Sequence, residues 1–171
     1  QIIPNAQPAA FPITITSVEF NPASGNQEQE YIQLSNPSSF EADISGWKLD
    51  GAVSMTFDPG TVIPAGGSLY ASPNSYAFRA RTTGPRGGQQ LQVQDRYNGQ
   101  LSARGEIIEL RDLTGVRVNS FTTPVAPTAA QQQLRITEIN FAPAPATPAE
   151  AAAIPGVSAG DFEFVELQNI G

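Results

Sequence analysis

The chain has 171 residues and a hydrophobic content of 40%, which suits one complete domain and part of another. Its net charge of −7 argues against nucleic acid and anionic lipid as partners, because phosphate binding depends on positive charge. The absence of cysteine and histidine excludes disulfides, thiolate chemistry, serine–histidine triads and ordinary zinc sites. No apolar run approaches the roughly 18 residues of a membrane-spanning helix, so we expect no membrane insertion.

The first strand contains a break in its hydrophobic alternation. Residues 1–12 are rich in proline and have no hydrophobic period, which predicts an N-terminal arm. In the strand that follows, Ile13 and Ile15 share one parity, whereas Val18 and Phe20 share the other, with the break between residues 16 and 17. One extra residue there, a β-bulge, would return all four side chains to one face. A strand that crosses between two sheets is the alternative.

Short alternating segments continue as far as residue 121, separated by turns rich in Gly, Pro and Asn. This spacing is typical of an antiparallel β-sandwich or barrel. In the second strand we expect Ile32 and Leu34 to point inward and Tyr31 to point outward. The expected core consists of Ile15, Ile32, Leu34, Trp47, Leu49, Phe57, Ile108 and Leu110.

Two local signals stand out within these segments. Residues 72–81 predict one short helix, with Ser72 as its N-cap and Pro73 at its first position. Asn98-Gly99 predicts a hairpin turn. The segment 43–49 is predicted as one strand with Trp47 in its middle.

The opening strand pair is repeated near the other end of the sequence. Residues 13–22 (ITITSVEFNP) return as 134–143 (LRITEINFAP), and residues 30–36 (EYIQLSN) return as 163–169 (EFVELQN). The break in hydrophobic alternation recurs at the equivalent position, because Leu134 and Ile136 share one parity and Ile139 and Phe141 share the other. A repeat of this length indicates tandem β-domains.

The repeat sets the expected domain boundaries. Residues 13–123 form a first module, 124–133 a linker by composition, and 134–171 the first two strands of a second, truncated copy. Two strands alone are marginally stable and have exposed edges. We therefore expect a dimer or strand exchange through residues 134–169.

Several ordered segments of the first module resemble the bacterial branch of the lamin tail domain family. Besides the two strands above, they are DISGWKL (43–49), FDPGTVIPAGGSL (57–69), NSYAFR (74–79) and EIIELRDLTGVRV (106–118). The resemblance implies an immunoglobulin-like fold. We therefore expect an all-β, immunoglobulin-like antiparallel β-sandwich with one short helix. The resemblance also implies an accessory domain of large secreted or cell-surface proteins, and it transfers no catalytic motif.

The sequence offers few residues for chemistry. Its carboxylate pairs are expected to be solvated strand edges and turn acceptors, so we predict no enzyme. We expect no cofactor and no metal. Calcium is the open alternative, with ligands from Asp58 near Gly60 or from Glu41 with Asp43, although no EF-hand loop motif is present.

Five arginines lie between residues 79 and 104 of this acidic chain. They suggest a candidate ligand surface for an anion, a glycan or an acidic partner, with tyrosines as stacking faces. Its residues are Tyr76, Arg79, Arg81 and Tyr97. A solubilising surface on long loops is the alternative.

The predicted function is a non-catalytic structural or interaction module of a larger secreted or surface protein. Such a module would tether or position neighbouring domains, with protein or glycan as its partner. The alternative is a carbohydrate-binding module that stacks exposed tyrosines on sugar rings. A row of exposed aromatic residues would favour the alternative, whereas a buried Trp47 and scattered tyrosines would count against it.

Overall fold

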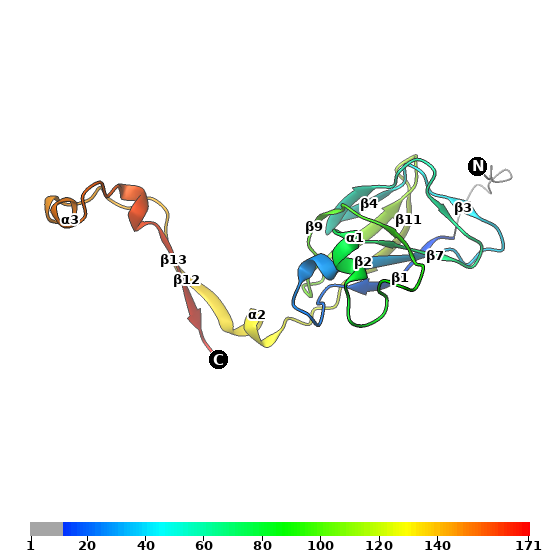
Figure 1. The fold of residues 1–171 in the computed structure, drawn as a ribbon, viewed down its shortest axis with the longest axis horizontal. Helices are drawn as coiled ribbons and strands as arrows, with labels where there is room; N and C mark the ends of the chain where they lie inside the picture. Colours follow the sequence, from blue (N-terminus) through cyan, green and yellow to red (C-terminus); the bar gives the residue numbers. More distant parts are fainter. Residues whose placement is uncertain (1–11) are drawn as a thin grey trace. The chain divides into compact units, whose positions relative to one another are not determined.

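The computed structural model describes residues 12–171, which form two compact units that divide between Ala126 and Pro127 (Figure 1). Apart from Pro12, the expected N-terminal arm lies outside the described residues. The first unit is a sandwich of two sheets, and the second unit contains a two-stranded sheet.

The first sheet of the sandwich has the strand order β1-β2-β7-β8. Its first three strands are antiparallel, and β8 joins β7 in parallel. The strands are β1 (Thr14–Glu19), β2 (Tyr31–Ser35), β7 (Ser68–Ala71) and β8 (Gln92–Gln94). Strand β2 therefore has a partner on each edge, whereas β1 forms one edge of the sheet.

The second sheet has the strand order β11-β10-β4-β5-β9 and is antiparallel throughout. Its strands are β4 (Lys48–Gly51), β5 (Val53–Thr56), β9 (Asn98–Gly99), β10 (Ile107–Arg111) and β11 (Arg117–Thr122). A further strand pair consists of β3 (Ala42–Asp43) and β6 (Val62–Ile63).

Two predictions for the second sheet are wrong. The segment 43–49 is not one strand, because a turn at Gly46, with φ +73°, separates β3 from β4 and places Trp47 just outside β4. Asn98-Gly99 is not a hairpin turn but strand β9, which pairs with β5.

The β-bulge in the first strand is confirmed. The pairing of β1 with β2 shifts register between Ile15 and Ser17, which leaves Thr16 as the extra residue. Ile13 and Ile15 are buried, and Val18 and Phe20 pack against the same core. The bulge therefore lets one strand direct all four apolar side chains into the sandwich.

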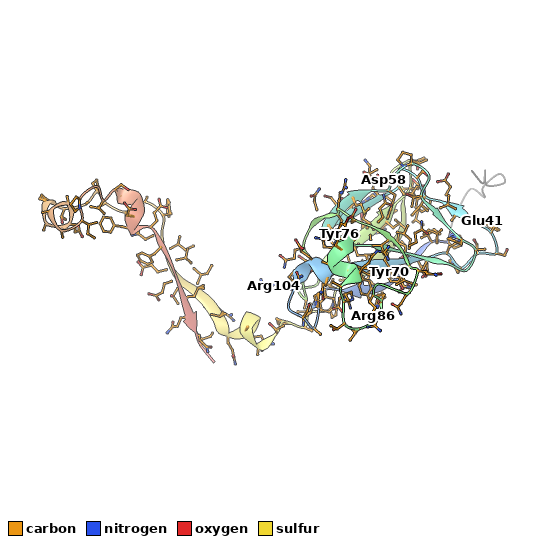
Figure 2. The ribbon with its side chains drawn as sticks, viewed as in Figure 1. Glu41, Asp58, Tyr70, Tyr76, Arg86 and Arg104 are labelled. Carbon is orange, nitrogen blue, oxygen red and sulfur yellow. The ribbon has the colours of Figure 1, made fainter. Side chains whose placement is uncertain are left out.

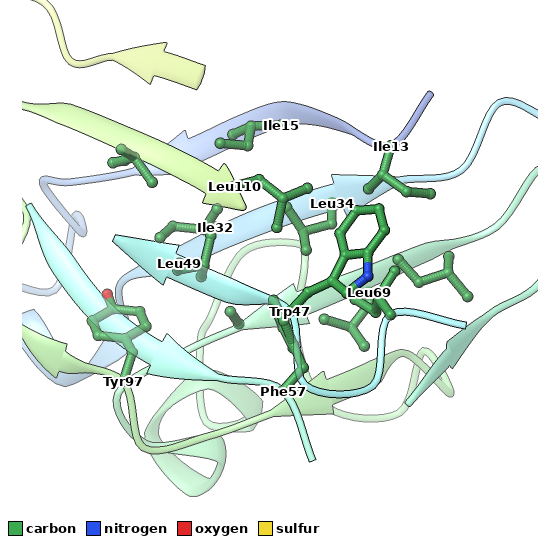
Figure 3. Close-up of a cluster of buried hydrophobic side chains, with 14 of the residues drawn as sticks. Ile13, Ile15, Ile32, Leu34, Trp47, Leu49, Phe57, Leu69, Tyr97 and Leu110 are labelled. Carbon is green, nitrogen blue, oxygen red and sulfur yellow. The ribbon is translucent and has the colours of Figure 1, made fainter. Parts of the chain in front are cut away.

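The core lies between the two sheets (Figure 3). Strand β2 contributes Ile32 and Leu34, and Leu49 and Leu110 approach them from the opposite sheet. All eight residues expected in the core are buried. Full burial of each large apolar side chain contributes roughly 1.5–3 kcal/mol, so this layer is the main source of stability in the unit.

Tyr31 points away from the core between the sheets, as expected, but the outer face of the first sheet is also covered. Tyr31 and Tyr70 are largely buried and pack edge-on against each other, with ring centroids 5.6 Å apart. Both rings also contact Phe78 of helix α1 (Ser75–Arg79). The helix begins two residues later than predicted, because Asn74 rather than Ser72 caps it. The Ser72 hydroxyl instead donates to the backbone oxygen of Glu30, 2.9 Å away.

The second unit is built around the hairpin of β12 (Leu134–Asn140) and β13 (Phe164–Asn169). Short helical segments occur before and within it: α2 (Ala129–Gln133), α3 (Pro148–Ala153) and the 3-10 turn η2 (Ala159–Phe162). The residues expected to form a linker are thus helical in part. A further 3-10 turn, η1 (Gln27–Gln29), precedes β2 in the first unit.

Gly51 gives a direct test of the packing between β4 and β10. Its φ is +99°, and a Cβ atom there would lie 2.2 Å from the backbone oxygen of Ile107. We expect Gly51→Ala to lower the free energy of unfolding by at least about 2 kcal/mol, because strain and a backbone clash act together. Urea unfolding measures the change.

Gly60→Ala is the matched control for this substitution. Gly60 also has a positive φ, +85°, but a Cβ atom there would meet no atom within 4 Å beyond its chain neighbours. Conformational strain alone predicts a loss of about 1 kcal/mol. Equal losses for the two variants would contradict the close approach of β4 to β10.

Candidate functional site

The predicted ligand surface does not assemble as one surface. Tyr76 and Arg79 lie on α1, where Tyr76 is 86% exposed (Figure 2). The Arg79 guanidinium donates to the backbone oxygen of Leu91 at 3.3 Å and remains at the surface. Arg86 and Arg104 lie at separate places on the unit (Figure 2), so the five arginines do not form one patch.

Arg81 is a structural residue, which corrects its place in the predicted surface. Its side chain is buried and donates to the backbone oxygens of Gln29 at 2.6 Å and Pro85 at 3.0 Å. It forms an ion pair with Glu19 at 3.3 Å and lies 5.0 Å from the centroid of the Tyr31 ring. These contacts connect the segment after α1 to β1, η1 and β2. Its guanidinium is therefore not available to a ligand at the surface.

Tyr97 is also buried, which removes it from the predicted surface. Its ring belongs to the core between the sheets, and its hydroxyl donates to Oε2 of Glu30 at 3.1 Å. Burial, followed by the nearby Glu30 carboxyl, raises the pKa of Tyr97. The phenol therefore stays protonated and serves as a hydrogen-bond donor.

Glu30 is the buried acid that sequence reasoning missed. It immediately precedes β2 and has no exposed surface. Oε2 accepts from Tyr97 and from the backbone N–H of Leu101 at 3.0 Å, whereas Oε1 has no protein partner. Burial raises the pKa of Glu30 to about 7, although the two hydrogen bonds oppose this change. A signal existed in the sequence, because the glutamate directly before this strand repeats at Glu163 in the second copy.

The closed surroundings of Glu30 limit its chemistry. An acid with a pKa near 7 has the proton affinity that general acid–base catalysis requires. A catalytic acid must also reach a substrate, and this carboxyl is enclosed by the core on every side. The arrangement therefore joins β2 to the loop at Leu101 rather than forming an active site.

A second buried polar residue, Asn36, holds the other end of β2. Its side-chain amide donates to the backbone oxygens of Phe40 at 2.8 Å, Ile63 at 3.1 Å and Pro64 at 3.1 Å. Its side-chain oxygen accepts from the backbone N–H of Ser38 at 3.1 Å. The residue fixes the turn after β2 and ties it to β6, so it also has a structural role.

A polar hollow of about 360 Å³ lies beside β5 and β9. Asp58, Asp95, Arg96 and Asn98 are among its lining residues. Asp95 accepts from the Ser75 hydroxyl at 2.8 Å and lies 3.7 Å from the Arg96 side chain. The Asp95 carboxylate is therefore paired with a hydroxyl and a cation, whereas the two acids of a glycosidase face each other across the bond that they cleave.

The two alternative calcium sites, Asp58 near Gly60 and Glu41 with Asp43, belong to different parts of the sandwich (Figure 2). Glu41 and Asp58 lie at separate points of the sandwich (Figure 2), and Asp43 accepts from the backbone and hydroxyl of Ser45. Within residues 12–171, the structure contains no group of three acidic side chains placed to hold a metal ion. The calcium alternative stays a prediction.

The second unit presents the most distinctive surface of the described chain. Strands β12 and β13 expose apolar side chains that are 45–61% accessible. They are Leu134, Ile136, Ile139, Phe164, Val165 and Leu167. Exposed apolar surfaces are typical of interaction sites in proteins.

Comparison with protein families matches residues 6–124 to the family described as Lamin Tail Domain. The match covers most of the chain and includes the whole described sandwich. Comparison with curated proteins gives no match. Among the described residues, no helix has the length and apolar character needed to cross a membrane.

The raised pKa of Glu30 predicts an unusual pH dependence of stability. The pKa is about 7 in the folded protein and 4.5 as the ordinary value, so the stabilisation is complete below pH 4.5. It is lost as the pH rises toward 7, because the unfolded chain ionises first. From pH 4.5 to 7.5 we expect wild type to lose about 2–3 kcal/mol relative to Glu30→Gln. Urea titrations of both proteins at several pH values measure this difference, and a pH-independent difference would contradict it.

Arg81 and Arg79 form a matched pair that separates structural from surface roles. We expect Arg81→Ala to lower the free energy of unfolding by about 2–4 kcal/mol, because it leaves Glu19 and two carbonyl groups without their partner. Arg79→Ala should stay within about 0.5 kcal/mol of wild type. Thermal and urea unfolding provide the measurements, and similar losses in both variants would show that Arg81 has no special structural role.

Proposed function

Because the chain belongs to the lamin tail domain family, we propose that it is a non-catalytic structural and interaction module. In this proposal it forms part of a larger secreted or cell-surface protein, in which it tethers or positions neighbouring domains. The immunoglobulin-like sandwich of the family is consistent with a structural module.

The observation that supports the proposal most strongly is the use of the buried polar side chains. Glu30, Asn36 and Arg81 all bind backbone groups of the same unit and connect segments distant in sequence. A catalytic or ligand site needs polar groups that face an accessible cleft. These three side chains instead hold loops to strands, which suits a rigid module.

The chain enters and leaves the sandwich at different ends (Figure 1), as expected of a domain that separates its neighbours. Strand β1 begins at one end of the first unit, and the segment after β11 leaves it at the opposite end (Figure 1). The edge strand β1 is held to β11 by a hydrogen bond from the Ile15 N–H to the Asn119 side-chain oxygen, at 3.0 Å. A module that receives and releases the chain at opposite ends keeps its neighbours a fixed distance apart.

The carbohydrate-binding alternative has little support in the described residues. Trp47 is buried, and Tyr31, Tyr70 and Tyr97 are buried or nearly so. Tyr76 is the one exposed tyrosine, whereas sugar-binding surfaces of this kind need aromatic faces in a row. Carbohydrate binding is therefore kept as one possible result of the glycan-binding experiment below.

The proposal predicts that the full chain neither binds glycans saturably nor hydrolyses them. An array of polysaccharides and cell-wall fragments, probed with the fluorescently labelled chain, measures binding. Tyr76→Ala and Ser75→Ala are the paired variants, because the first removes the exposed ring and the second changes its neighbour. Saturable binding lost in Tyr76→Ala but kept in Ser75→Ala would replace the module proposal with the carbohydrate-binding one.

The proposed location outside the cell has its own measurement. Protease added to intact cells of the source organism should degrade the polypeptide that contains this chain, as followed with an antibody against residues 12–126. A cytoplasmic protein should remain intact under the same conditions. If both survive until the cells are lysed, the surface location is wrong.

A further inference from the structure

The hairpin β12–β13 reproduces the pairing of β1–β2 residue by residue. Ile136 pairs with Leu167 as Ile15 pairs with Leu34, and the register then shifts past one extra residue in each hairpin. That residue is a threonine in both cases, Thr137 in the second hairpin. A bulge that recurs at the same position specifies the same strand geometry, because it sets which side chains share a face.

The two hairpins differ in what covers them. In the first unit Ile15, Ile32 and Leu34 are buried against the opposite sheet. Their counterparts Ile136, Val165 and Leu167 are 57–61% exposed. Strand β2 also pairs with β7 along its second edge, whereas β13 has β12 as its partner in a two-stranded sheet. The second hairpin thus retains an apolar face and a strand edge that its unit does not cover.

The polar residues at the two ends of β13 show which occupant fits. Glu163 stands where Glu30 precedes β2, and Asn169 stands where Asn36 follows it. Asn169 already forms the same turn, since its side-chain oxygen accepts from the N–H two residues later, at Gly171, as Asn36 accepts from Ser38.

The other hydrogen-bond partners of Glu30 and Asn36 lie outside the β1–β2 hairpin. In the first unit, Glu30 accepts from Leu101 and Asn36 donates to Ile63, and both partners belong to the body of the sandwich, residues 37–123. Apolar contact alone would not require a glutamate and an asparagine at these positions. Their recurrence matches a partner that has the polar groups of a sandwich body as well as its apolar face.

We propose that the exposed face of β12–β13 is the docking surface for the body of a second lamin-tail sandwich. The occupant is a polypeptide segment with the pattern of residues 37–123, joined to β13 as those residues are joined to β2. Its strand equivalent to β7 pairs with the free edge of β13, and its second sheet covers Ile136, Val165 and Leu167. Glu163 and Asn169 then become buried and hydrogen-bonded like Glu30 and Asn36.

A second copy of the hairpin fits this surface less well. Two hairpins packed face to face would cover the apolar side chains. They would leave Glu163 without the tyrosine hydroxyl and backbone N–H that Glu30 binds, and Asn169 without the three carbonyl groups that Asn36 binds. A buried polar group without its partner is destabilising.

The test adds the proposed occupant to the full chain. A copy of residues 39–126 is joined after Gly171, because Gly171 corresponds to Ser38. Hydrogen exchange compares the extended protein with the 171-residue chain. We expect amides of β12 and β13 to exchange at least about 100-fold more slowly in the extended protein, because local opening then requires unfolding of a complete sandwich.

Paired substitutions show whether docking uses the expected groups. In the extended protein, Asn169→Ala should speed exchange in β13 by about tenfold or more, whereas Gln168→Ala should leave it within about twofold. A chimaera adds a second readout. In it, residues 134–171 replace residues 13–38 within the full chain, and we expect cooperative unfolding with Trp47 still buried, as followed by its fluorescence.

Three results would overturn the proposal. The first is that amides of β12 and β13 exchange at the same rate in the extended protein as in the 171-residue chain, while the chimaera is unfolded. Another is equal effects of Asn169→Ala and Gln168→Ala. The third is a dimer of the 171-residue chain, seen in its native mass, in which β12 and β13 are already protected, since this would assign the face to a second copy.

Discussion

The structure depends on how strand β2 is held. It pairs on both edges, directs Ile32 and Leu34 into the space between the sheets, and is fixed at each end by a buried polar residue. Glu30 ties one end to Leu101 and Tyr97, while Asn36 ties the other end to the backbone near Ile63. Apolar packing supplies most of the stability, whereas the two polar residues determine which loops meet the strand.

This arrangement explains why the sandwich has the character of a module. Its buried polar side chains join β1, β2 and the loops around them, as the Arg81 contacts show. The outer face of the first sheet, which could have been a binding surface, is closed by α1 through Phe78. The large apolar side chains that strands leave exposed therefore lie mainly in the second unit.

The sequence predicted features that depend on local pattern. The break after Thr16 located the bulge, and the alternation in β2 identified Ile32 and Leu34 as core residues. Features that depend on distant partners were missed. Arg81 and Tyr97 are buried by partners 62 and 67 residues away, which no local window contains. Asn98-Gly99 has the composition of a turn, yet pairing with β5 makes it a strand, because tertiary contacts outweigh local preference.

The most direct measurement is a ¹³C NMR titration of the Glu30 side-chain carboxyl in the full chain, with the amide of Leu101 observed in parallel. A carboxyl enclosed at the end of β2 should titrate near pH 7, and the Leu101 amide shift should follow the same curve because the two groups share a hydrogen bond. Titration near pH 4.5 with no response at Leu101 would mean that the carboxyl faces water, and the account of β2 as a strand fixed by buried polar residues would be wrong.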